Sequence, residues 1–140
     1  MGLRADINDL IARYAWAADE DDIDGIAACF TADGVFATNN GSPPAEGVDA
    51  IRELFASARR RRAAAGQRTR HVMGNVLVAK CADGATAKSY LTLVTTQPDG
   101  RTAVECSAEY NDTLVQVGGK WRFSERRITF DVLPSSLVPD

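Results

Sequence analysis

Apolar residues near the start of the chain recur every three or four positions, which is the spacing of one face of an α-helix. Between Asp6 and Asp19 the recurring residues are Ile7, Leu10, Ile11, Tyr14, Ala15 and Ala18. They predict a first helix that leads into an acidic run over residues 19–22. The apolar pattern resumes from Ile23 to Phe30 and predicts a shorter second helix. The two helices therefore meet near Asp19.

A third helical pattern follows a segment rich in turn-forming residues. Residues 32–34 predict a turn, residues 35–38 a short strand and residues 39–44 a loop, because Asn, Asp, Gly, Ser and Pro supply turn geometry. After Gly47 apolar residues return at helical spacing and predict a helix over residues 48–65. Its expected core stripe is Val48, Ile51, Leu54, Phe55 and Ala58.

The second half of the chain is rich in residues that favour β-structure. It predicts four strands, at 69–80, 84–97, 101–117 and 120–133. The strands are separated by the pairs Asp-Gly, Asp-Gly and Gly-Gly, which are strong hairpin signals and indicate an antiparallel meander. Because the helices come first and the meander second, we predict an α+β domain whose helices cover one face of a bent sheet.

The size and charge of the chain narrow its organisation and its partners. Its 140 residues, of which 45% are hydrophobic, suit one domain over residues 1–140 with a single core. The 16 basic and 19 acidic residues give a net charge of -3. This balance argues against a nucleic-acid partner, because phosphate binding needs a positive surface. A small uncharged or mildly anionic ligand is compatible with it.

The cysteines and the N-terminal residues indicate a reducing compartment. Cys29, Cys81 and Cys106 are odd in number, with no Cys-x-x-Cys spacing and no His cluster, so they indicate neither a disulfide framework nor a zinc site. We expect all three to be small buried hydrophobic residues. Residues 1–9 lack the apolar core of a signal peptide, and no later run reaches membrane-spanning length. We therefore expect a cytoplasmic protein with no membrane partner.

His71 is the only histidine in the sequence and the first candidate for chemistry. It lies early in the first long predicted strand, where alternation places it on one face with Met73, Asn75 and Leu77. An imidazole among apolar neighbours is a candidate general base, because histidine ordinarily titrates close to neutral pH. The alternative is a structural histidine that hydrogen-bonds a backbone carbonyl or lies at the sheet edge.

Two residues of the first predicted helix are candidates to act with His71. Asp19 closes the helix, where a carboxylate is unfavourable against the macrodipole and needs compensation. A histidine would supply it, and the carboxylate would fix the tautomer of the imidazole. Tyr14 lies roughly 140° around the helix from Asp19, so its phenol could donate to a developing oxyanion in the same cavity. The alternatives are a solvated acidic turn for Asp19 and a core position for Tyr14.

Arg126 is a candidate ligand-binding residue in the last predicted strand. Alternation places it on one face with Ile128 and Phe130, and on the face opposite to Phe123 and Arg127. From that face a guanidinium could reach into a pocket and hold an anionic or carbonyl group. The alternative is a solvated arginine at the end of a strand.

Several short stretches together resemble a known family. They are residues 7–14 (Ile-Asn-Asp-Leu-Ile-Ala-Arg-Tyr), Asp19, residues 30–36 (Phe-Thr-Ala-Asp-Gly-Val-Phe), residues 70–71 (Arg-His) and residues 119–123 (Gly-Lys-Trp-Arg-Phe). In this order, the chain resembles the SnoaL-like branch of the NTF2-like superfamily over about residues 6–133. The resemblance implies a cone in which N-terminal helices pack on a strongly curved, mainly antiparallel sheet.

The resemblance also implies a kind of chemistry. Similar proteins include scytalone dehydratase, bile acid 7α-dehydratase, hexachlorocyclohexane dehydrochlorinase and polyketide cyclases, which use an Asp and His pair without a metal or organic cofactor. Asp19 and His71 fall where that pair is expected, and Tyr14 matches a tyrosine of the bile acid enzyme. Arg126 corresponds to an arginine of the dehydrochlorinase pocket, although a slip of one residue would select Arg127. The chain lacks the second active-site histidine of scytalone dehydratase.

These observations predict a cofactor-independent lyase or isomerase that eliminates water from a small hydrophobic cyclic substrate. His71 is the expected base and Asp19 its orienting partner, while Tyr14 or Arg126 steadies negative charge. Strand parity and the resemblance together give the expected pocket wall, which is Trp16, Phe30, Phe36, Met73, Tyr90, Cys106 and Tyr110. The resemblance also favours a homodimer.

Two other functions fit the same sequence. One is a non-catalytic domain whose cone only holds a ligand or supports a dimer. The other is a polyketide cyclase or epoxide hydrolase, in which different polar groups position the reactants. Asn75, Asn111 and Asp112 are the residues that hint at such groups.

Overall fold

The computed structural model describes residues 2–133, which form three helices and six strands. The helices are α1 (Leu3–Asp19), α2 (Ile23–Ala28) and α3 (Val48–Ala65). The apolar periodicity predicted α3 with the same bounds and α1 with the same end. Among the described residues, no helix is both long and apolar enough to cross a membrane.

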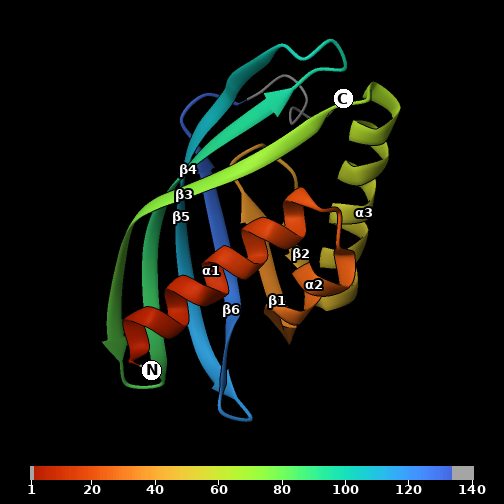
Figure 1. Cartoon of the computed structure of the whole chain (residues 1–140). Helices are drawn as coiled ribbons and strands as arrows, with labels where there is room; N and C mark the ends of the chain where they lie inside the picture. Colours follow the sequence, from red (N-terminus) through yellow and green to blue (C-terminus); the bar gives the residue numbers. More distant parts are fainter. Residues whose placement is uncertain (1, 134–140) are drawn as a thin grey trace.

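The strands form one sheet. They are β1 (Phe30–Thr38), β2 (Ala45–Glu46), β3 (Arg68–Cys81), β4 (Gly84–Thr96), β5 (Thr102–Val117) and β6 (Lys120–Phe130). Their order is β2-β1-β6-β5-β4-β3, so β3 is an edge strand (Figure 1). The antiparallel pairing of β3 through β6 confirms the predicted meander and the α+β class.

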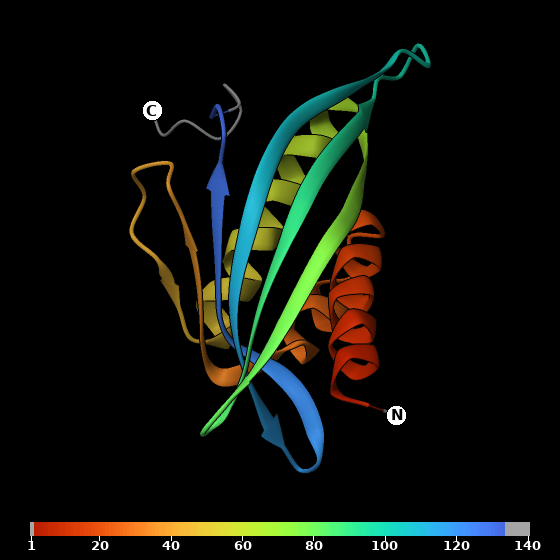
Figure 2. The same ribbon diagram turned by 90° about the vertical axis from the view of Figure 1, so that its left-hand side faces the viewer.

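Figure 2 shows how strongly the sheet is bent, with α3 lying in its concavity and α1 running beside β3. The core fills the space between the helices and this concave face. Tyr14 of α1 lies at its centre, only 1% exposed. Its ring makes edge contacts with Phe30, Phe55, Tyr110 and Phe123 at centroid distances of 6.0 to 6.3 Å.

The predicted second helix was wrong at its end, and the predicted first strand was wrong at its start. The helix stops at Ala28, and Phe30 already pairs with Phe123 of β6 in a parallel ladder. The backbone carbonyl of Cys29 accepts a hydrogen bond from the Phe123 N–H at 2.8 Å. Pairing with a strand far away in the sequence thus overrides the local helical pattern. The predicted turn at residues 32–34 lies within an irregular part of β1.

A β-bulge in β3 changes which side chains face the core. The pairing of β3 with β4 shifts between Gly74 and Leu77, where Asn75 has a φ of 52°. Beyond the bulge Val76 packs against the core, while Leu77 is 65% exposed. The prediction that His71, Met73, Asn75 and Leu77 share one face was therefore wrong after Gly74, because the extra residue reverses the alternation.

A second irregularity in β6 brings Phe123 and Arg126 onto the same face. The pairing with β5 shifts between Thr113 and Leu114, so Leu114 pairs with Phe123 and Thr113 with Glu125. Both Phe123 and Arg126 are completely buried. Strict alternation had separated these two residues, and that prediction was wrong.

Candidate active site

Asp19 and His71 meet where the end of α1 lies beside the edge strand β3. The Asp19 carboxylate accepts hydrogen bonds from the His71 backbone N–H, at 2.9 Å to Oδ1 and 3.1 Å to Oδ2. The same Oδ1 lies 2.6 Å from Nδ1 of the His71 ring. These bonds compensate a carboxylate that stands at the unfavourable end of a helix. The structure therefore brings together the two residues that the sequence singled out.

The contact fixes the form of the imidazole. A carboxylate only accepts hydrogen bonds, so Nδ1 carries the hydrogen and a neutral ring keeps its lone pair on Nε2. Nε2 lies on the side of the ring remote from Asp19. The side chains of His71 and Asp19 are 8% and 19% exposed, so the pair is largely shielded and still reachable. This geometry is that of an oriented general base.

Tyr14 is a buried hydroxyl-bearing residue close to this pair. Its ring stands edge-on to the His71 ring with a centroid distance of 6.4 Å. Burial raises the pKa of the Tyr14 phenol well above its usual value, and a hydrogen bond to Tyr110 adds to that rise. Burial also raises the pKa of Tyr110. Both phenols therefore stay protonated and can act only as neutral hydrogen-bonding groups near neutral pH.

Arg126 lies beneath Tyr14 in a fully buried ion pair. Its Nε and Nη2 donate to the two carboxylate oxygens of Asp112 at 2.8 and 3.0 Å. The guanidinium carbon lies 4.4 Å from the Tyr14 ring centroid, 3.8 Å from that of Tyr110 and 4.2 Å from that of Phe123. Within residues 2–133 the remaining nitrogen, Nη1, has no hydrogen-bond partner.

Asp112 and Arg126 each stabilise the ionised form of the other. Burial raises the pKa of the Asp112 carboxyl, and the Arg126 guanidinium opposes that rise. Burial disfavours the charge of Arg126, yet Asp112, Tyr110 and Tyr14 raise the pKa of its guanidinium above the usual value. Arg127, by contrast, has a side chain that is 58% exposed and pairs with Glu125. Arg126 is therefore the inward arginine, and the solvated alternative was wrong.

Most of the expected pocket wall lies on the concave side of the sheet. Phe30, Phe36, Met73, Cys106 and Tyr110 all belong to the core or pack against it.

The prediction that Tyr90 forms part of the inward pocket wall was wrong. Tyr90 is 58% exposed on the outer face, because its neighbour Ser89 is the residue that faces inward, at 1% exposure. Trp16 is also 68% exposed. It lines a surface groove of about 820 Å³ that runs along α1 and reaches Asp19 and His71, so it lies near the pair without belonging to the core.

The cysteines divide into two groups. Cys29 and Cys106 are buried as expected, and Cys81 at the end of the edge strand is exposed, which corrects the expectation for that residue. Burial raises the pKa of the Cys29 thiol and that of the Cys106 thiol, the latter to about 11. Both are therefore protonated near neutral pH. Within residues 2–133, no three His, Cys, Asp or Glu side chains are grouped to hold a metal ion.

Sequence reasoning treated Asp112 only as a weak hint and did not identify Phe55, Phe123 or Ser89 as part of this region. The signal for Asp112 was present, because it alternates with Tyr110 and Leu114, both of which are buried. Its partner could not be assigned, since the irregular register between β5 and β6 decides which arginine lies opposite.

The sequence that forms this fold and the Asp19–His71 contact matches a known family. The SnoaL-like domain family matches residues 2–127. The chain belongs to this family. No curated protein sequence is similar enough to this SnoaL-like chain to count as a match.

Solved structures similar to this SnoaL-like protein share its whole architecture. Aln2 from a Streptomyces species is 31% identical with a TM-score of 0.84, and the alignment covers 92% of this chain and 91% of that one. A protein from Catenulispora acidiphila in complex with S-DNPA is 29% identical with a TM-score of 0.83, over 92% and 93% of the two chains.

An NTF2-like protein with a cystatin-like fold from Novosphingobium aromaticivorans is 25% identical with a TM-score of 0.81. The alignment covers 98% of this chain and 89% of that one. These likenesses confirm the NTF2-like architecture that the resemblance implied.

Proposed function

We propose that this SnoaL-like protein is a cofactor-independent lyase or isomerase that acts on a small hydrophobic cyclic substrate. The observation that carries the proposal is the 2.6 Å contact between His71 Nδ1 and Asp19 Oδ1. It leaves Nε2 of an oriented imidazole as the base. The shielded position of the pair, at 8% and 19% side-chain exposure, supports the same role.

The reaction that fits best begins with the removal of a proton next to a carbonyl group. His71 Nε2 takes the proton, and the electron pair of the C–H bond forms a carbon–carbon double bond as a hydroxyl leaves from the next carbon. His71 then returns the proton to that hydroxyl, so that water departs and the base is regenerated. Asp19 stabilises the imidazolium that exists between the two transfers.

Developing negative charge on the carbonyl oxygen needs a donor nearby. The Tyr14 phenol remains protonated because burial raises its pKa, and its ring lies 6.4 Å from that of His71. Its O–H would exchange the hydrogen bond to Tyr110 for one to the substrate oxygen. Arg126 lies next to Tyr14, with its guanidinium carbon 4.4 Å from the Tyr14 ring centroid. Its positive charge would stabilise negative charge that develops on this side of the site. Arg126 is thus a positioning residue in this proposal.

The nature of the surrounding side chains supports an apolar ligand. The groove that reaches Asp19 and His71 is also lined by Trp16, Val72 and Met73, whose apolar side chains suit a hydrophobic ring system. The similar protein from Catenulispora acidiphila was solved in complex with S-DNPA, which supports a ligand-binding role for this architecture.

The proposal is tested with 1-tetralone, a bicyclic ketone with exchangeable protons next to its carbonyl. In D₂O the wild-type protein should accelerate exchange of the C2 protons, as followed by NMR. His71→Gln should slow that exchange by about 10²- to 10⁴-fold, the usual contribution of a positioned base. Lys88→Ala, an exposed substitution, is the control and should leave the rate unchanged. Exchange no faster than in buffer, or unaffected by His71→Gln, would favour a domain that only binds its ligand.

A further inference from the structure

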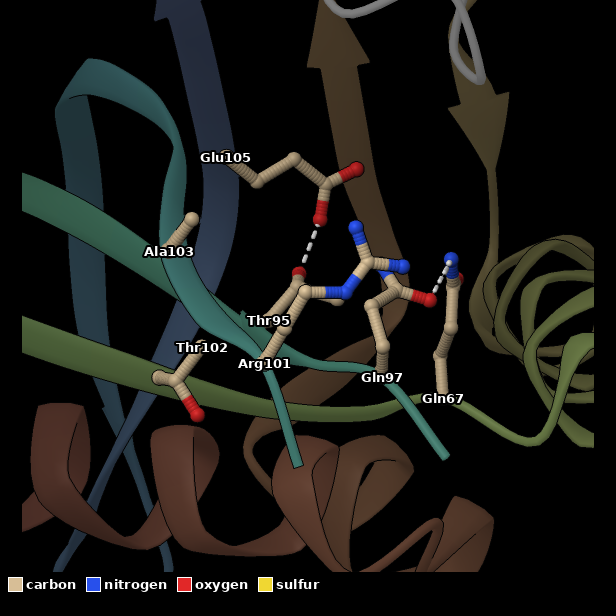
Figure 3. A pocket seen from close by; sticks show the side chains of 7 residues that line it. All are labelled: Gln67, Thr95, Gln97, Arg101, Thr102, Ala103 and Glu105. Carbon is tan, nitrogen blue, oxygen red and sulfur yellow. Dashed lines mark hydrogen bonds between the residues drawn. The ribbon is translucent and has the colours of Figure 1, made fainter. Parts of the chain in front are cut away.

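A hollow beside the hairpin that joins β4 and β5 is not used by the proposed mechanism. Its volume is about 550 Å³. Its polar lining consists of Gln67, Thr95, Gln97, Arg101, Thr102 and Glu105. In Figure 3 the Arg101 guanidinium is drawn between the Glu105 carboxylate and the Gln97 amide. Gln97 and Arg101 belong to the hairpin that joins β4 and β5.

The hollow adjoins His71 along the concave face. Thr95 of β4 pairs with Thr69, and two residues earlier Leu93 pairs with His71. Side chains two residues apart on a strand share a face and are separated by about 7 Å. Thr95 is buried at 6% exposure. Its side chain therefore faces inward, next to the inward side chains of His71 and Leu93.

A β-bulge in β5 turns Glu105 toward the hollow. Leu93 pairs with Cys106, whereas Val94 pairs with Val104, so Glu105 is the extra residue of the bulge. The Thr95 hydroxyl donates a hydrogen bond to the Glu105 carboxylate. Because Cys106 faces the core, regular alternation would have placed Glu105 on the outer face. Bulges next to active sites commonly redirect a side chain in this way.

The lining offers hydrogen-bond donors and acceptors together. Arg101 Nε donates to Asp99 Oδ2 at 2.7 Å, and the Arg101 side chain is 81% exposed. Its terminal nitrogens are drawn between Glu105 and Gln97 (Figure 3). The Gln67 amide nitrogen lies 3.3 Å from Gln97 Oε1. Arg101 and Glu105 carry opposite charges, so the hollow favours neither an anion nor a cation. A neutral group with hydroxyl or carbonyl oxygens matches this lining.

We propose that this hollow is the recognition subsite of the substrate site, and that it binds the neutral, hydroxyl-bearing end of a ligand whose ring lies beside His71. Glu105 accepts a hydrogen bond from that hydroxyl, and Arg101 donates one to its oxygen. The assignment rests on the proposed function, because it takes the ring beside His71 to be the substrate. A fused bicyclic ring is long enough to reach from the His71 side chain to the hollow.

The test compares two ligands that differ only at the end expected to enter the hollow. Isothermal titration of the wild-type protein with 6-hydroxy-1-tetralone and with 1-tetralone measures the preference for the hydroxyl. We expect the hydroxylated ketone to bind about tenfold more tightly, as for a hydrogen bond to a charged group. Glu105→Ala and Arg101→Ala should each reduce or abolish this preference, and since both side chains lie on the surface, thermal unfolding should confirm that both variants fold.

Two controls separate this inference from the proposed function. Lys88→Ala and Glu109→Ala remove an ion pair on the outer face of the sheet and should keep the preference. His71→Gln should also keep it while losing isotope exchange, so the subsite and the base can fail independently. Equal affinities for the two ketones, no binding of either, or a preference that survives both Glu105→Ala and Arg101→Ala would overturn the subsite.

Discussion

At the scale of single residues, the carboxylate of Asp19 has two effects on His71: it holds the ring in one tautomer and supplies negative charge. Asp19→Asn keeps one oxygen, which can still accept from the His71 backbone N–H and from Nδ1, and it removes the charge together with the second oxygen that accepts from the same N–H. We expect it to slow C2 exchange of 1-tetralone by about 10²-fold or more, because the imidazolium formed after proton transfer loses its counter-charge.

The matched control for this prediction is Asp21→Asn. Asp21 belongs to the same acidic run, and its φ of 55° is one that asparagine tolerates well. Its rate of exchange should equal that of the wild type. An Asp19→Asn protein that exchanges as fast as Asp21→Asn would show that the charge of Asp19 has no part in the reaction.

A carboxylate at a helix end and a lone histidine made Asp19 and His71 candidates in the sequence, and the family resemblance made them the expected pair. The sequence was not sufficient for Arg126 and Asp112. Their pairing depends on a shift of register between β5 and β6, and one extra residue in a strand leaves no mark in the alternation of a single sequence.

At the scale of elements, the hairpin between β3 and β4 depends on a close approach of two backbones. A Cβ added to Gly84 would lie 2.1 Å from the carbonyl oxygen of Leu114 in β5. Backbone atoms of a central strand cannot move aside without breaking the ladder. We expect Gly84→Ala to lower the free energy of unfolding by about 1 to 3 kcal/mol, as for other overpacked sites.

Denaturant unfolding measures this difference, and Gly74→Ala is the control within the neighbouring strand. A Cβ at Gly74 would meet no atom within 4 Å. Its substitution should therefore change stability much less. Equal destabilisation by the two substitutions would mean that the loss of glycine itself, and not the contact with Leu114, is responsible.

The elements differ in how well the sequence predicted them. The helix α3 and the strands of the meander have strong periodicity and clear turn residues, so local pattern was enough. The start of β1 was missed because Phe30 continues the apolar face of α2 and only its distant partner Phe123 makes it a strand. Information of that kind is present in the fold and absent from any local window of sequence.

At the scale of the whole molecule, the core contains several weak acids that burial keeps protonated. The pKa values of Tyr14, Tyr110, Cys29 and Cys106 are all raised by burial, that of Cys106 from 9.0 to about 11. Between these two values the unfolded chain has released protons that the folded chain still binds. Stability should therefore fall as the pH rises from about 9 to 11.

Thermal unfolding at a series of alkaline pH values measures this dependence. Cys106→Ala should make the decline less steep, because one of the contributing acids is gone. Cys81→Ala removes an exposed thiol and should leave the slope unchanged. A wild-type protein whose melting temperature is constant up to pH 11 would contradict the expectation.

The bond between Asp19 and the backbone of His71 has a consequence outside catalysis. An edge strand with free N–H groups can recruit a strand from another molecule, and proteins commonly block such edges with charge. Asp19 occupies one of these groups on β3 and places a negative charge beside it. We therefore expect the carboxylate proposed to orient the base also to hinder the addition of a foreign strand at this position, so that selection against aggregation would favour Asp19 even in a relative that had lost its activity.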